Sequence, residues 1–327
     1  MKQLEEYWSD RNPVSLSLLP LSWLFCLIAW LRRRAFHFGL FKIHQVQAPV
    51  IVVGNISVGG TGKTPLVVWL AGYLQQQGFR PGIVARGYGA DTGNTPRPVR
   101  PDSKVDEVGD EPLLISRRTG CPMFVAPDRV AAARALLAAT DCDIIISDDG
   151  MQHYALGRDI EIAVIDGRRR FGNSFCLPAG PLREHPSRLK QVDLVIANGQ
   201  AEMDEHVMHI RASKAVNLVN PEIRCDLEEF SGQRLLALAG IGDPQRFFSM
   251  LREHGLHPNE WAFPDHHSFV ASDISPDDDF SVLMTEKDAV KCSHIARPRH
   301  WYVPIDVEVD EAFSQRLAEL LRGLKRG

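Results

Sequence analysis

The 327-residue sequence predicts an α/β protein with two lobes and an apolar helix at its N-terminus. Short runs of β-branched residues alternate with helix-length amphipathic segments, which is typical of a mostly parallel sheet covered by helices. Apolar residues make up 44% of the chain and charged residues 24%, as in ordinary globular proteins. The length suggests about two domains. These observations exclude a disordered or fibrous chain.

The first element expected is a helix over the uncharged apolar residues 14–31, which Arg32–Arg34 follow at once. A secretory signal would carry its positive charges before the apolar run. A membrane-spanning helix needs about 20 apolar residues, and Pro20 interrupts this run. Its tryptophans and the arginines favour a helix lying in a membrane interface, although a buried core helix is the alternative. Residues 1–45 are therefore predicted to be a membrane-associated N-terminal helical segment.

Charge is unevenly distributed along the chain. Lys plus Arg is 37 and Asp plus Glu is 41, so the net charge is −4. Residues 11–90 contain no Asp or Glu but carry a charge of +8 from eight Lys and Arg residues. This segment would attract phosphates or anionic lipid head groups. Because the whole chain has no basic bias, no nucleic acid partner is expected.

Neither disulfides nor metal clusters are expected from the Cys and His residues. The six cysteines are scattered without zinc-type spacing, which favours reduced thiols in a cytoplasmic environment. Asp265, His266 and His267 have side chains suited to a metal, but no third ligand stands at the right spacing. A solvent-facing polar turn is the simpler interpretation of these three residues.

A Gly-rich loop follows the strand expected near residues 50–53. Residues 54–65 read GNISVGGTGKTP and lead into a helix expected near 64–77, which is the context of a phosphate-binding P-loop. Glycines let backbone N–H groups face phosphate oxygens, and the helix N-terminus adds partial positive charge. Ser57 stands where the usual pattern has Gly. The predicted nucleotide-binding residues are Ser57, Val58, Gly59, Gly60, Thr61, Gly62, Lys63 and Thr64.

Two roles in this loop follow from P-loop chemistry. Lys63 would reach the β- and γ-phosphates, and Thr64 would bind Mg²⁺. A carboxylate near the metal is also needed, and the apolar strand expected near 143–147 ends in Asp148 and Asp149. Adjacent aspartates cannot point the same way from a strand, so one would bind Mg²⁺ directly and the other through water. A strand-end turn is the simpler alternative.

The remaining elements divide the chain after the N-terminal segment. Strands near 82–85, 122–126, 160–165 and 193–197 alternate with helices near 111–119 and 128–139. This alternation predicts a P-loop NTPase-like lobe with a mostly parallel sheet over residues 46–200. Residues 201–233 are expected to be a connector, and residues 234–327 a smaller C-terminal α/β lobe. That lobe should hold strands near 281–285 and 301–305 and a final helix from about 310 to 324.

Several further motifs occur in a fixed order: RGYG (86–89), GDEP (109–112), SDDGMQH (147–153), LPAGPLRE (177–184), PDHH (264–267) and MTEKDAVK (284–291). Together with the P-loop, this series resembles the tetraacyldisaccharide 4′-kinase family of lipid A biosynthesis. The resemblance extends over nearly the whole chain. Two small departures are Ser57, where Thr is more usual, and Ser174, where Gly is expected.

The resemblance implies an ATP- and Mg²⁺-dependent kinase that phosphorylates the 4′-hydroxyl of a tetraacylated glucosamine disaccharide 1-phosphate. Asp110 would take the hydroxyl proton and His266 would pair with it, with Lys63 as the third catalytic residue. Thr64, Asp148 and Asp149 would serve the metal. The residues implied for the substrate and phosphate cleft are Arg86, Tyr88, Glu111, Arg183 and Glu184. The lipid substrate implies contact with membrane lipid, at the cytoplasmic face of the inner membrane, with the protein peripheral or monotopic.

Two other interpretations stay open from the sequence. A membrane-associated P-loop ATPase switch of the partitioning or targeting type would share the P-loop and the apolar helix. Such a switch needs no Asp–His pair and commonly has a Lys early in its P-loop, where this chain has Ser57 and Val58. A cytosolic sugar or nucleoside kinase would leave residues 14–31 unexplained.

Overall fold

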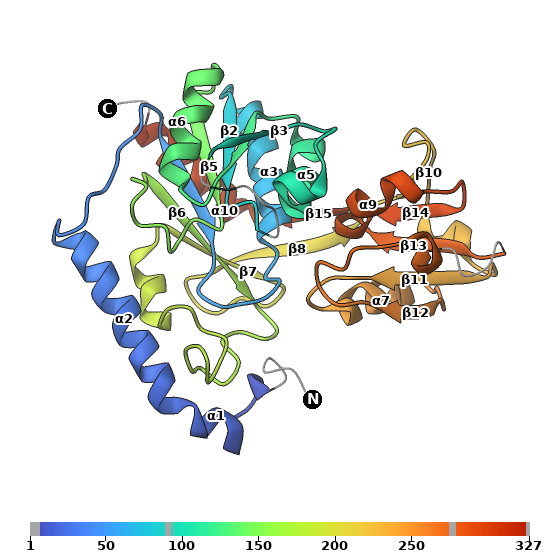
Figure 1. Ribbon diagram of the computed structural model, residues 1–327, viewed down its shortest axis with the longest axis horizontal. Helices are drawn as coiled ribbons and strands as arrows, with labels where there is room; N and C mark the ends of the chain where they lie inside the picture. Colours follow the sequence, from blue (N-terminus) through green and yellow to red (C-terminus); the bar gives the residue numbers. More distant parts are fainter. Residues whose placement is uncertain (1–6, 89–92, 94, 275–278, 325–327) are drawn as a thin grey trace.

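The computed structural model describes residues 7–88, 93, 95–274 and 279–324, and Gly89 of the RGYG motif lies outside them. Two sheets lie side by side, each with its own helices (Figure 1). We call the sheet that contains the P-loop strand, with its helices, the first lobe, and the other the second lobe. This mixed α/β architecture agrees with the predicted fold class.

The first lobe contains a nine-stranded sheet of order β15-β8-β7-β6-β1-β5-β2-β4-β3. Neighbouring strands are parallel except at the two edges, where β15 and β3 run antiparallel to their neighbours. Its strands are β1 (Val50–Gly54), β2 (Pro81–Ala85), β3 (Arg97–Val99), β4 (Met123–Val125), β5 (Ile144–Asp148), β6 (Ile160–Asp166), β7 (Leu194–Asn198), β8 (His206–Ala212) and β15 (Ile305–Val309). The parallel pairing places the C-terminal ends of β1, β5 and β6 side by side.

Helices cover both faces of this sheet, so its strands are buried on both sides. Ile51 and Val53 point into one core with α3, α5 and α10, whereas Val50 and Val52 point into the other with α6. The helices of this lobe are α3 (Lys63–Gln76), α4 (Val105–Val108), α5 (Asp110–Thr119), α6 (Arg129–Ala139) and α10 (Glu311–Leu324), with a 3₁₀ turn at Pro186–Gln191. Successive side chains of β1 face opposite cores, and all of them are buried, which explains why the strand is apolar throughout.

The second lobe contains a six-stranded sheet of order β10-β9-β14-β13-β11-β12. Its strands are β9 (Ala215–Asn217), β10 (Arg224–Cys225), β11 (Leu235–Ala239), β12 (Asn259–Ala262), β13 (Ser281–Thr285) and β14 (His300–Val303). Its helices are α7 (Pro244–Glu253), α8 (Ala271–Ile274) and α9 (Glu286–Cys292), with 3₁₀ turns at Leu227–Phe230 and Ser293–Ile295. Its strands β14, β13, β11 and β12 are parallel, and β12 forms one edge of the sheet.

The chain crosses between the lobes twice, and this differs from the sequence-based division. The predicted connector 201–233 contains β8, which belongs to the first sheet, and β9 and β10, which belong to the second. The chain then returns at Pro304, so β15 and α10 complete the first lobe rather than the second. Ser213 N donates to Pro304 O at 2.9 Å, which ties the two crossings together. One predicted strand near 301–305 is two strands, because the chain changes sheets at Pro304.

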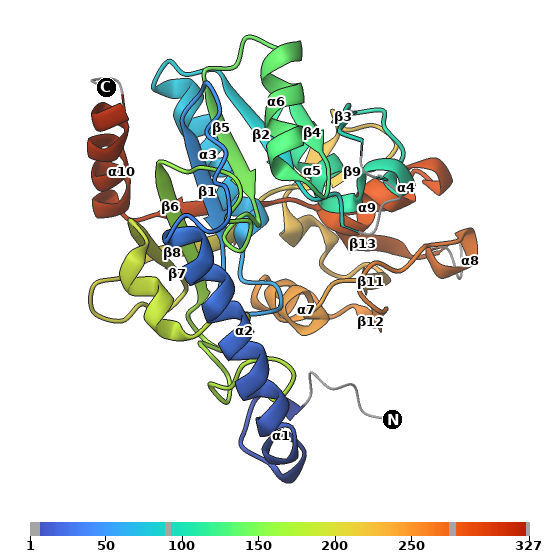
Figure 2. The same cartoon turned by 60° about the vertical axis from the view of Figure 1, so that its left-hand side comes forward.

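The N-terminal helices α1 (Pro13–Ser17) and α2 (Leu19–His37) lie along the outside of the first lobe (Figure 2). Ser22 is the one buried residue of α2, and its hydroxyl donates to Cys176 O at 2.7 Å. Large apolar side chains on the same helix are exposed, and Trp23 is 68% exposed. Because Phe25 and Cys26 of α2 pack against the core, the helix has apolar side chains on its inner face as well as on its exposed face, unlike an ordinary surface helix. Within the described ranges, none of the helices has the length and apolar character required to cross a bilayer.

The expectation that all cysteines are reduced is wrong for one pair. Cys26 of α2 and Cys176 form a disulfide across a sequence separation of 150. Both side chains belong to the apolar core under α2, where the helix contacts the loop that follows β6. The other four cysteines are free. Sequence spacing could not reveal the pair because the fold alone brings these segments together.

Candidate active site

The Gly-rich loop lies at the C-terminal end of β1 and ends at the first turn of α3, which begins with Lys63. Gly62 has a φ of +97°, and a Cβ atom there would lie 2.8 Å from Met208 Cε, so only glycine fits this turn. Val58 N donates to Pro181 O at 2.8 Å, which fixes the start of the loop against the LPAGPLRE segment. The loop therefore has the backbone shape of a phosphate cradle.

The two aspartates at the end of β5 have different surroundings. Asp148 is buried, and its Oδ1 atom has no hydrogen-bond partner. The pKa of Asp148 is raised to about 7, first by burial and then by the nearby charges of Glu111 and Asp149, against the charges of Lys63 and Arg129. A bound cation would compensate this buried carboxylate, so Asp148 has the properties expected of a metal ligand.

Asp149, in contrast, is already neutralised by basic side chains. Arg183 Nη1 donates to both of its carboxylate oxygens at 3.0 Å, and Lys63 Nζ lies 3.6 Å from Oδ1. Burial alone would raise the pKa of Asp149, but Lys63 and Arg183 lower it below the ordinary value. Asp149 therefore holds two cationic side chains at the mouth of the P-loop.

An Asp–His pair joins the two lobes opposite the P-loop. His266 Nδ1 lies 2.9 Å from Asp110 Oδ2, and the ring donates to the carboxylate. Asp110 is the first residue of α5 in the first lobe, whereas His266 follows β12 in the second. Gly109 has a φ of +91°, and a Cβ atom there would lie 2.8 Å from Tyr88 O. This glycine permits the sharp turn that directs the Asp110 carboxylate into the cleft.

The pair is held in its charged form. Burial alone would raise the pKa of Asp110, but the hydrogen bond from His266 and the charge of Lys287 lower it below 3.8. The hydrogen bond to Asp110 raises the pKa of His266 above 6.5, against burial and the charge of Lys287. Asp110 is therefore an ionised carboxylate over the physiological pH range, able to accept a proton.

The LPAGPLRE segment forms one wall beside the P-loop. Arg183 N donates to Ile56 O at 2.7 Å, and the Glu184 carboxylate accepts hydrogen bonds from Gln152 and Tyr154. Glu184 is buried, so these donors stabilise a charge that would otherwise be unfavourable there. The wall thus fixes the backbone of the loop and the position of the Arg183 guanidinium.

The other cleft residues implied by the resemblance lie nearer the Asp–His pair. Tyr88 is exposed, and its ring centroid is 5.4 Å from that of His266. Glu111 accepts a hydrogen bond from Lys287 at 3.0 Å. Arg86 is exposed at the C-terminal end of β2. Tyr88, implied by the resemblance for the substrate and phosphate cleft, therefore lies at the Asp–His end of the cleft.

All these residues line one cleft of about 2370 Å³ between the lobes. The predicted residues found in its wall are Ser57, Val58, Gly59, Gly60, Thr61, Gly62, Lys63, Thr64, Arg86, Tyr88, Asp110, Glu111, Asp148, Asp149, Arg183, Glu184 and His266. The volume exceeds that of a typical small-molecule pocket of about 300–1,000 Å³. The cleft has room for a nucleotide together with a second, large substrate.

Several cleft residues were not predicted from the sequence. Arg129 is buried beside Asp149, with its Nη2 donating to the Asp149 carbonyl at 3.4 Å. Arg246 of α7 donates to Gly60 O at 3.2 Å and to Asp166 at 2.7 Å, which places a second-lobe guanidinium against the P-loop. Lys287 contacts the Asp–His pair. Arg246 lies in the first turn of α7, just after the Gly-rich residues 240–242, and this position is the only sequence signal for its role.

The Asp265-His266-His267 run does not form a metal cluster. Among the described residues, no group of three or more His, Cys, Asp or Glu side chains could hold a metal ion. His267 Nε2 lies 3.0 Å from Asp273 Oδ2, and its ring stacks on Phe263. His266 instead pairs with Asp110, and both Asp265 and His266 line the cleft.

Comparison with known proteins gives a consistent result. The family model described as tetraacyldisaccharide-1-P 4′-kinase matches residues 14–322. A tetraacyldisaccharide 4′-kinase of Nitrosococcus oceani is 51% identical over 97% of this chain and 93% of its own length. One from Pseudoalteromonas atlantica is 50% identical over 94% of this chain and 100% of its own. A crystal structure of LpxK from Aquifex aeolicus in complex with ATP has a TM-score of 0.82 at 26% identity, covering 95% of this chain and 99% of that one.

Proposed function

This chain belongs to the tetraacyldisaccharide-1-P 4′-kinase family, and from that premise we propose how its residues share the work of phosphoryl transfer. The protein is an ATP-dependent kinase that phosphorylates the 4′ position of a tetraacyldisaccharide 1-phosphate in lipid A synthesis. Membership of a kinase family removes the alternative of an ATPase switch without a phosphate acceptor.

The nucleotide end of the cleft is built for a triphosphate and Mg²⁺. Backbone N–H groups of the loop 57–64 and the N-terminus of α3 would hold the phosphates, with Lys63 adjacent to them. Thr64 and Asp148 would hold the metal, because Asp148 carries the buried carboxylate oxygen without a partner. When bound, Mg²⁺ neutralises charge on the β- and γ-phosphates. Arg183, fixed by Asp149, adds a further positive charge beside them.

The acceptor end of the cleft supplies the base. The ionised Asp110 carboxylate would take the proton of the 4′-hydroxyl. The hydroxyl oxygen would bond to the γ-phosphorus as the bond between the γ-phosphorus and ADP breaks. His266 would hold that carboxylate through the 2.9 Å hydrogen bond and balance its charge. Each residue of the pair comes from a different lobe, so the base is complete only when the lobes are apposed.

The observation that carries this assignment is a single cleft containing the P-loop, the two aspartates and the Asp110–His266 pair. The test is transfer of labelled γ-phosphate from ATP to tetraacyldisaccharide 1-phosphate in detergent by wild type and by Asp110→Asn. Loss of transfer with retained nucleotide binding supports the assignment. Equal transfer rates would remove Asp110 from the chemistry.

We also propose that α2 docks the enzyme on the cytoplasmic face of the inner membrane, as a peripheral or monotopic protein. Support comes from the exposed face of α2, which carries Trp23, Leu27 and Leu31 at successive turns. Exposing such a stripe to water is unfavourable, whereas an interface between lipid and water accommodates it. The acylated substrate lies in that interface, and the ATP that the enzyme uses is a cytoplasmic donor.

Arg32 and Arg33 face the site rather than the lipid. Arg32 donates to Gln152 O at 3.3 Å and lines the cleft, and Arg33 lies 3.9 Å from Glu184. The guanidinium of Arg34 lies over the rings of Trp30 and Phe38, as that of Arg32 does over Phe36, but Arg34 does not line the cleft. Only Arg34 thus fits the expected role at lipid head groups. Arg32 is suited to the 1-phosphate of a glycolipid that enters the cleft along α2.

A further inference from the structure

The run Thr285–Asp288 has no role in the transfer described above, although all four of its side chains are engaged. Thr285 Oγ1 donates to Asp288 Oδ2 at 2.7 Å, and Gly240 N donates to the same oxygen at 2.8 Å. Asp288 N in turn donates to Thr285 Oγ1 at 3.1 Å, which caps the N-terminus of α9. These bonds fix the first turn of α9 to the second sheet.

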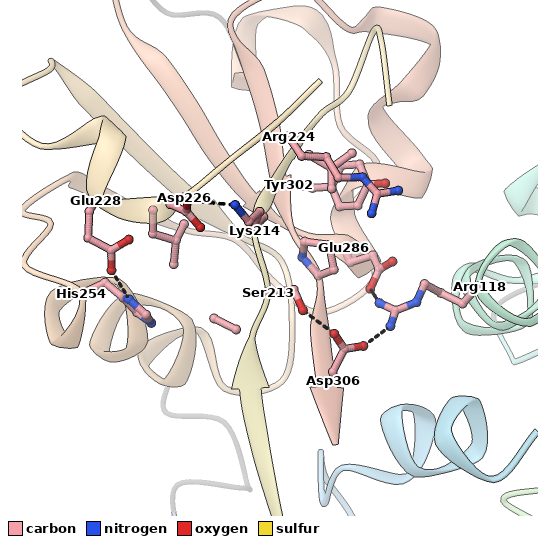
Figure 3. Close-up of a pocket in the computed structure, with 14 residues that line it drawn as sticks. Arg118, Ser213, Lys214, Arg224, Asp226, Glu228, His254, Glu286, Tyr302 and Asp306 are labelled. Atoms are coloured by element: carbon pink, nitrogen blue, oxygen red, sulfur yellow. Dashed lines mark hydrogen bonds and ion pairs between the residues drawn. The ribbon is translucent and has the colours of Figure 1, made fainter. Parts of the chain in front are cut away.

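Glu286, the first residue of α9, connects this turn to the first lobe. Arg118 of α5 donates to Glu286 at 2.9 Å and also bonds to Asp306 of β15 (Figure 3). The Arg118 side chain is largely buried beside a cavity of about 620 Å³ at the junction of the lobes. The ion pair therefore holds α9 against α5, the helix that begins with Asp110.

Lys287 follows directly and reaches the other end of α5. Its ammonium nitrogen lies 3.0 Å from Glu111 Oε1, 3.2 Å from Asp265 Oδ1 and 3.8 Å from Asp110 Oδ2. The side chain is only 16% exposed, and an ammonium removed from water is unfavourable unless carboxylates surround it. Two of the three carboxylates belong to the first lobe, and the third precedes His266 in the second. Lys287 therefore joins both halves of the Asp–His pair.

We propose that Lys287 is a positioning residue for the transfer, which holds the Asp110 carboxylate ionised and keeps the His266 turn against α5. This inference rests on the proposed role of Asp110 as proton acceptor. Lys287 acts through Asp110 and Asp265 rather than through the substrate. The run Thr285–Asp288 then has one structural role, because its residues Glu286 and Lys287 attach the second lobe to the two ends of α5.

The charges around Asp110 support this assignment. His266 approaches it from the turn after β12, Lys287 and Lys291 from α9, and Glu111 follows it on α5. Lys291 is bonded to Asp288 at 2.7 Å, so Lys287 is the cation of α9 that contacts Asp110 itself. Burial alone would lower the pKa of Lys287, but the three carboxylates raise it above its ordinary value. Lys287 is therefore charged whenever the base is in use.

The first test is a kcat–pH profile of Lys287→Met, which keeps the length of the side chain but removes its charge. We expect kcat at neutral pH to fall about tenfold or more, with the KM for ATP unchanged. The acid limb of the profile should move up by about one pH unit, because Asp110 loses a stabilising cation. Lys287→Arg should restore the position of the acid limb. An unmoved limb in Lys287→Met overturns the proposal.

Two control variants distinguish loss of the Lys287 charge from a weakened contact between α5 and α9 and from loss of a surface charge. Glu286→Gln weakens the same contact between α5 and α9 but leaves the Lys287 charge. The acid limb of the kcat–pH profile of this variant should therefore stay where it is in wild type. Lys214→Met removes an exposed lysine that pairs with Asp226 outside the cleft. Its profile should match that of wild type. A shift of the limb in either control as large as in Lys287→Met would contradict a specific role for Lys287.

A readout independent of activity is the titration of His266 by NMR of histidine-labelled protein, with the signal assigned by its absence in His266→Gln. The pKa of His266 in Lys287→Met should be higher than that of wild type, because the neighbouring positive charge of Lys287, which lowers it, is removed. An unchanged value overturns the inference even if Asp110→Asn abolishes transfer. Conversely, normal transfer by Asp110→Asn would defeat the proposed function while leaving the ion-pair geometry intact. Thermal unfolding of each variant verifies that it is folded.

Discussion

Asp110 of the first lobe and His266 of the second share a hydrogen bond of 2.9 Å across 156 positions of sequence. The proposed base is thus assembled from two sheets, which the chain connects at Ser213 and Pro304. Any opening of the lobes would separate the pair. If Asp110 accepts the proton, as proposed, transfer requires the two lobes to be in contact.

The first prediction concerns the base itself. Asp110→Asn keeps the shape of the side chain but removes the charge, and it should lower kcat by roughly 10²–10⁴-fold. Binding of ATP, measured by calorimetry, should change little, because the P-loop contacts are separate from Asp110. Tighter or weaker nucleotide binding in proportion to the loss of kcat would contradict the division of roles.

The second prediction is a pH window for the stability contributed by the pair. Asp110 has a lowered pKa, so its contribution is present above the unfolded value of 3.8 and is lost as the pH falls through the folded value. His266 has a raised pKa, so its contribution is present below 6.5 and is lost as the pH rises through the folded value. The coupling free energy of the Asp110→Asn and His266→Gln cycle should be largest between these pH values. Thermal unfolding at a series of pH values measures it, and a flat coupling would contradict the ion pair.

The third prediction separates the two aspartates. Asp148→Asn should raise the Mg²⁺ concentration needed for half-maximal activity, because the buried oxygen without a partner belongs to Asp148. Asp149→Asn should act mainly through Arg183 and Lys63, which it would release. Titration of activity with Mg²⁺ compares the two variants. The same Mg²⁺ dependence in both would mean that both carboxylates bind the metal directly.

The fourth prediction concerns Arg32. Because Arg32 lines the cleft at the side of α2, Arg32→Ala should raise the KM for the tetraacyldisaccharide 1-phosphate and leave the KM for ATP unchanged. Loss of one charge-assisted contact of about 1.5–3 kcal/mol corresponds to an increase of roughly tenfold or more. Arg80→Ala is the matched control, since Arg80 pairs with Asp143 and does not line the cleft. Equal effects in the two variants would indicate a general loss of charge.

The fifth prediction tests membrane docking by α2. Replacing Trp23, Leu27 and Leu31 together by Ser removes an exposed apolar stripe and should release the protein from anionic phospholipid vesicles in sedimentation assays. The control replaces Val219 and Ile223 by Ser, which are exposed apolar residues of the second lobe. Activity toward a soluble, short-chain substrate should persist in the first variant. Unchanged sedimentation would assign lipid binding to another surface.

Much of the first lobe follows from sequence, because its strands are buried on both faces. Such strands are continuous runs of Val and Ile, as at 50–53 and 144–146, and each is bounded by glycine or a charged residue. Local chemistry also identifies the P-loop, since glycines, Lys63 and a helix start must stand together. Most residues implied by the family motifs follow the end of a strand or begin a helix, which brings them to one cleft. Arg183 and Glu184 lie instead in the loop between β6 and the 3₁₀ turn Pro186–Gln191.

What sequence could not provide depends on contacts between distant segments. Lys287 lies 176 positions from Glu111, and no local pattern indicates that a lysine at the start of α9 should approach α5. β15 was assigned to the second lobe because it follows β14 after only Pro304. The sequence of α2 does not indicate which of its faces is exposed, and only the fold shows that Ser22 is buried and Trp23 exposed. In each case a tertiary contact, rather than local secondary-structure propensity, determines where the segment lies.

The return of the chain to the first sheet also determines when that lobe can be completed. Phe313, Leu317 and Leu321 of α10 pack into the core beneath α3, and β15 forms the last edge of the sheet beyond β8. These segments follow the strands of the second lobe in the chain and are therefore synthesised after them. The first lobe cannot complete its hydrophobic core until the second lobe has been made.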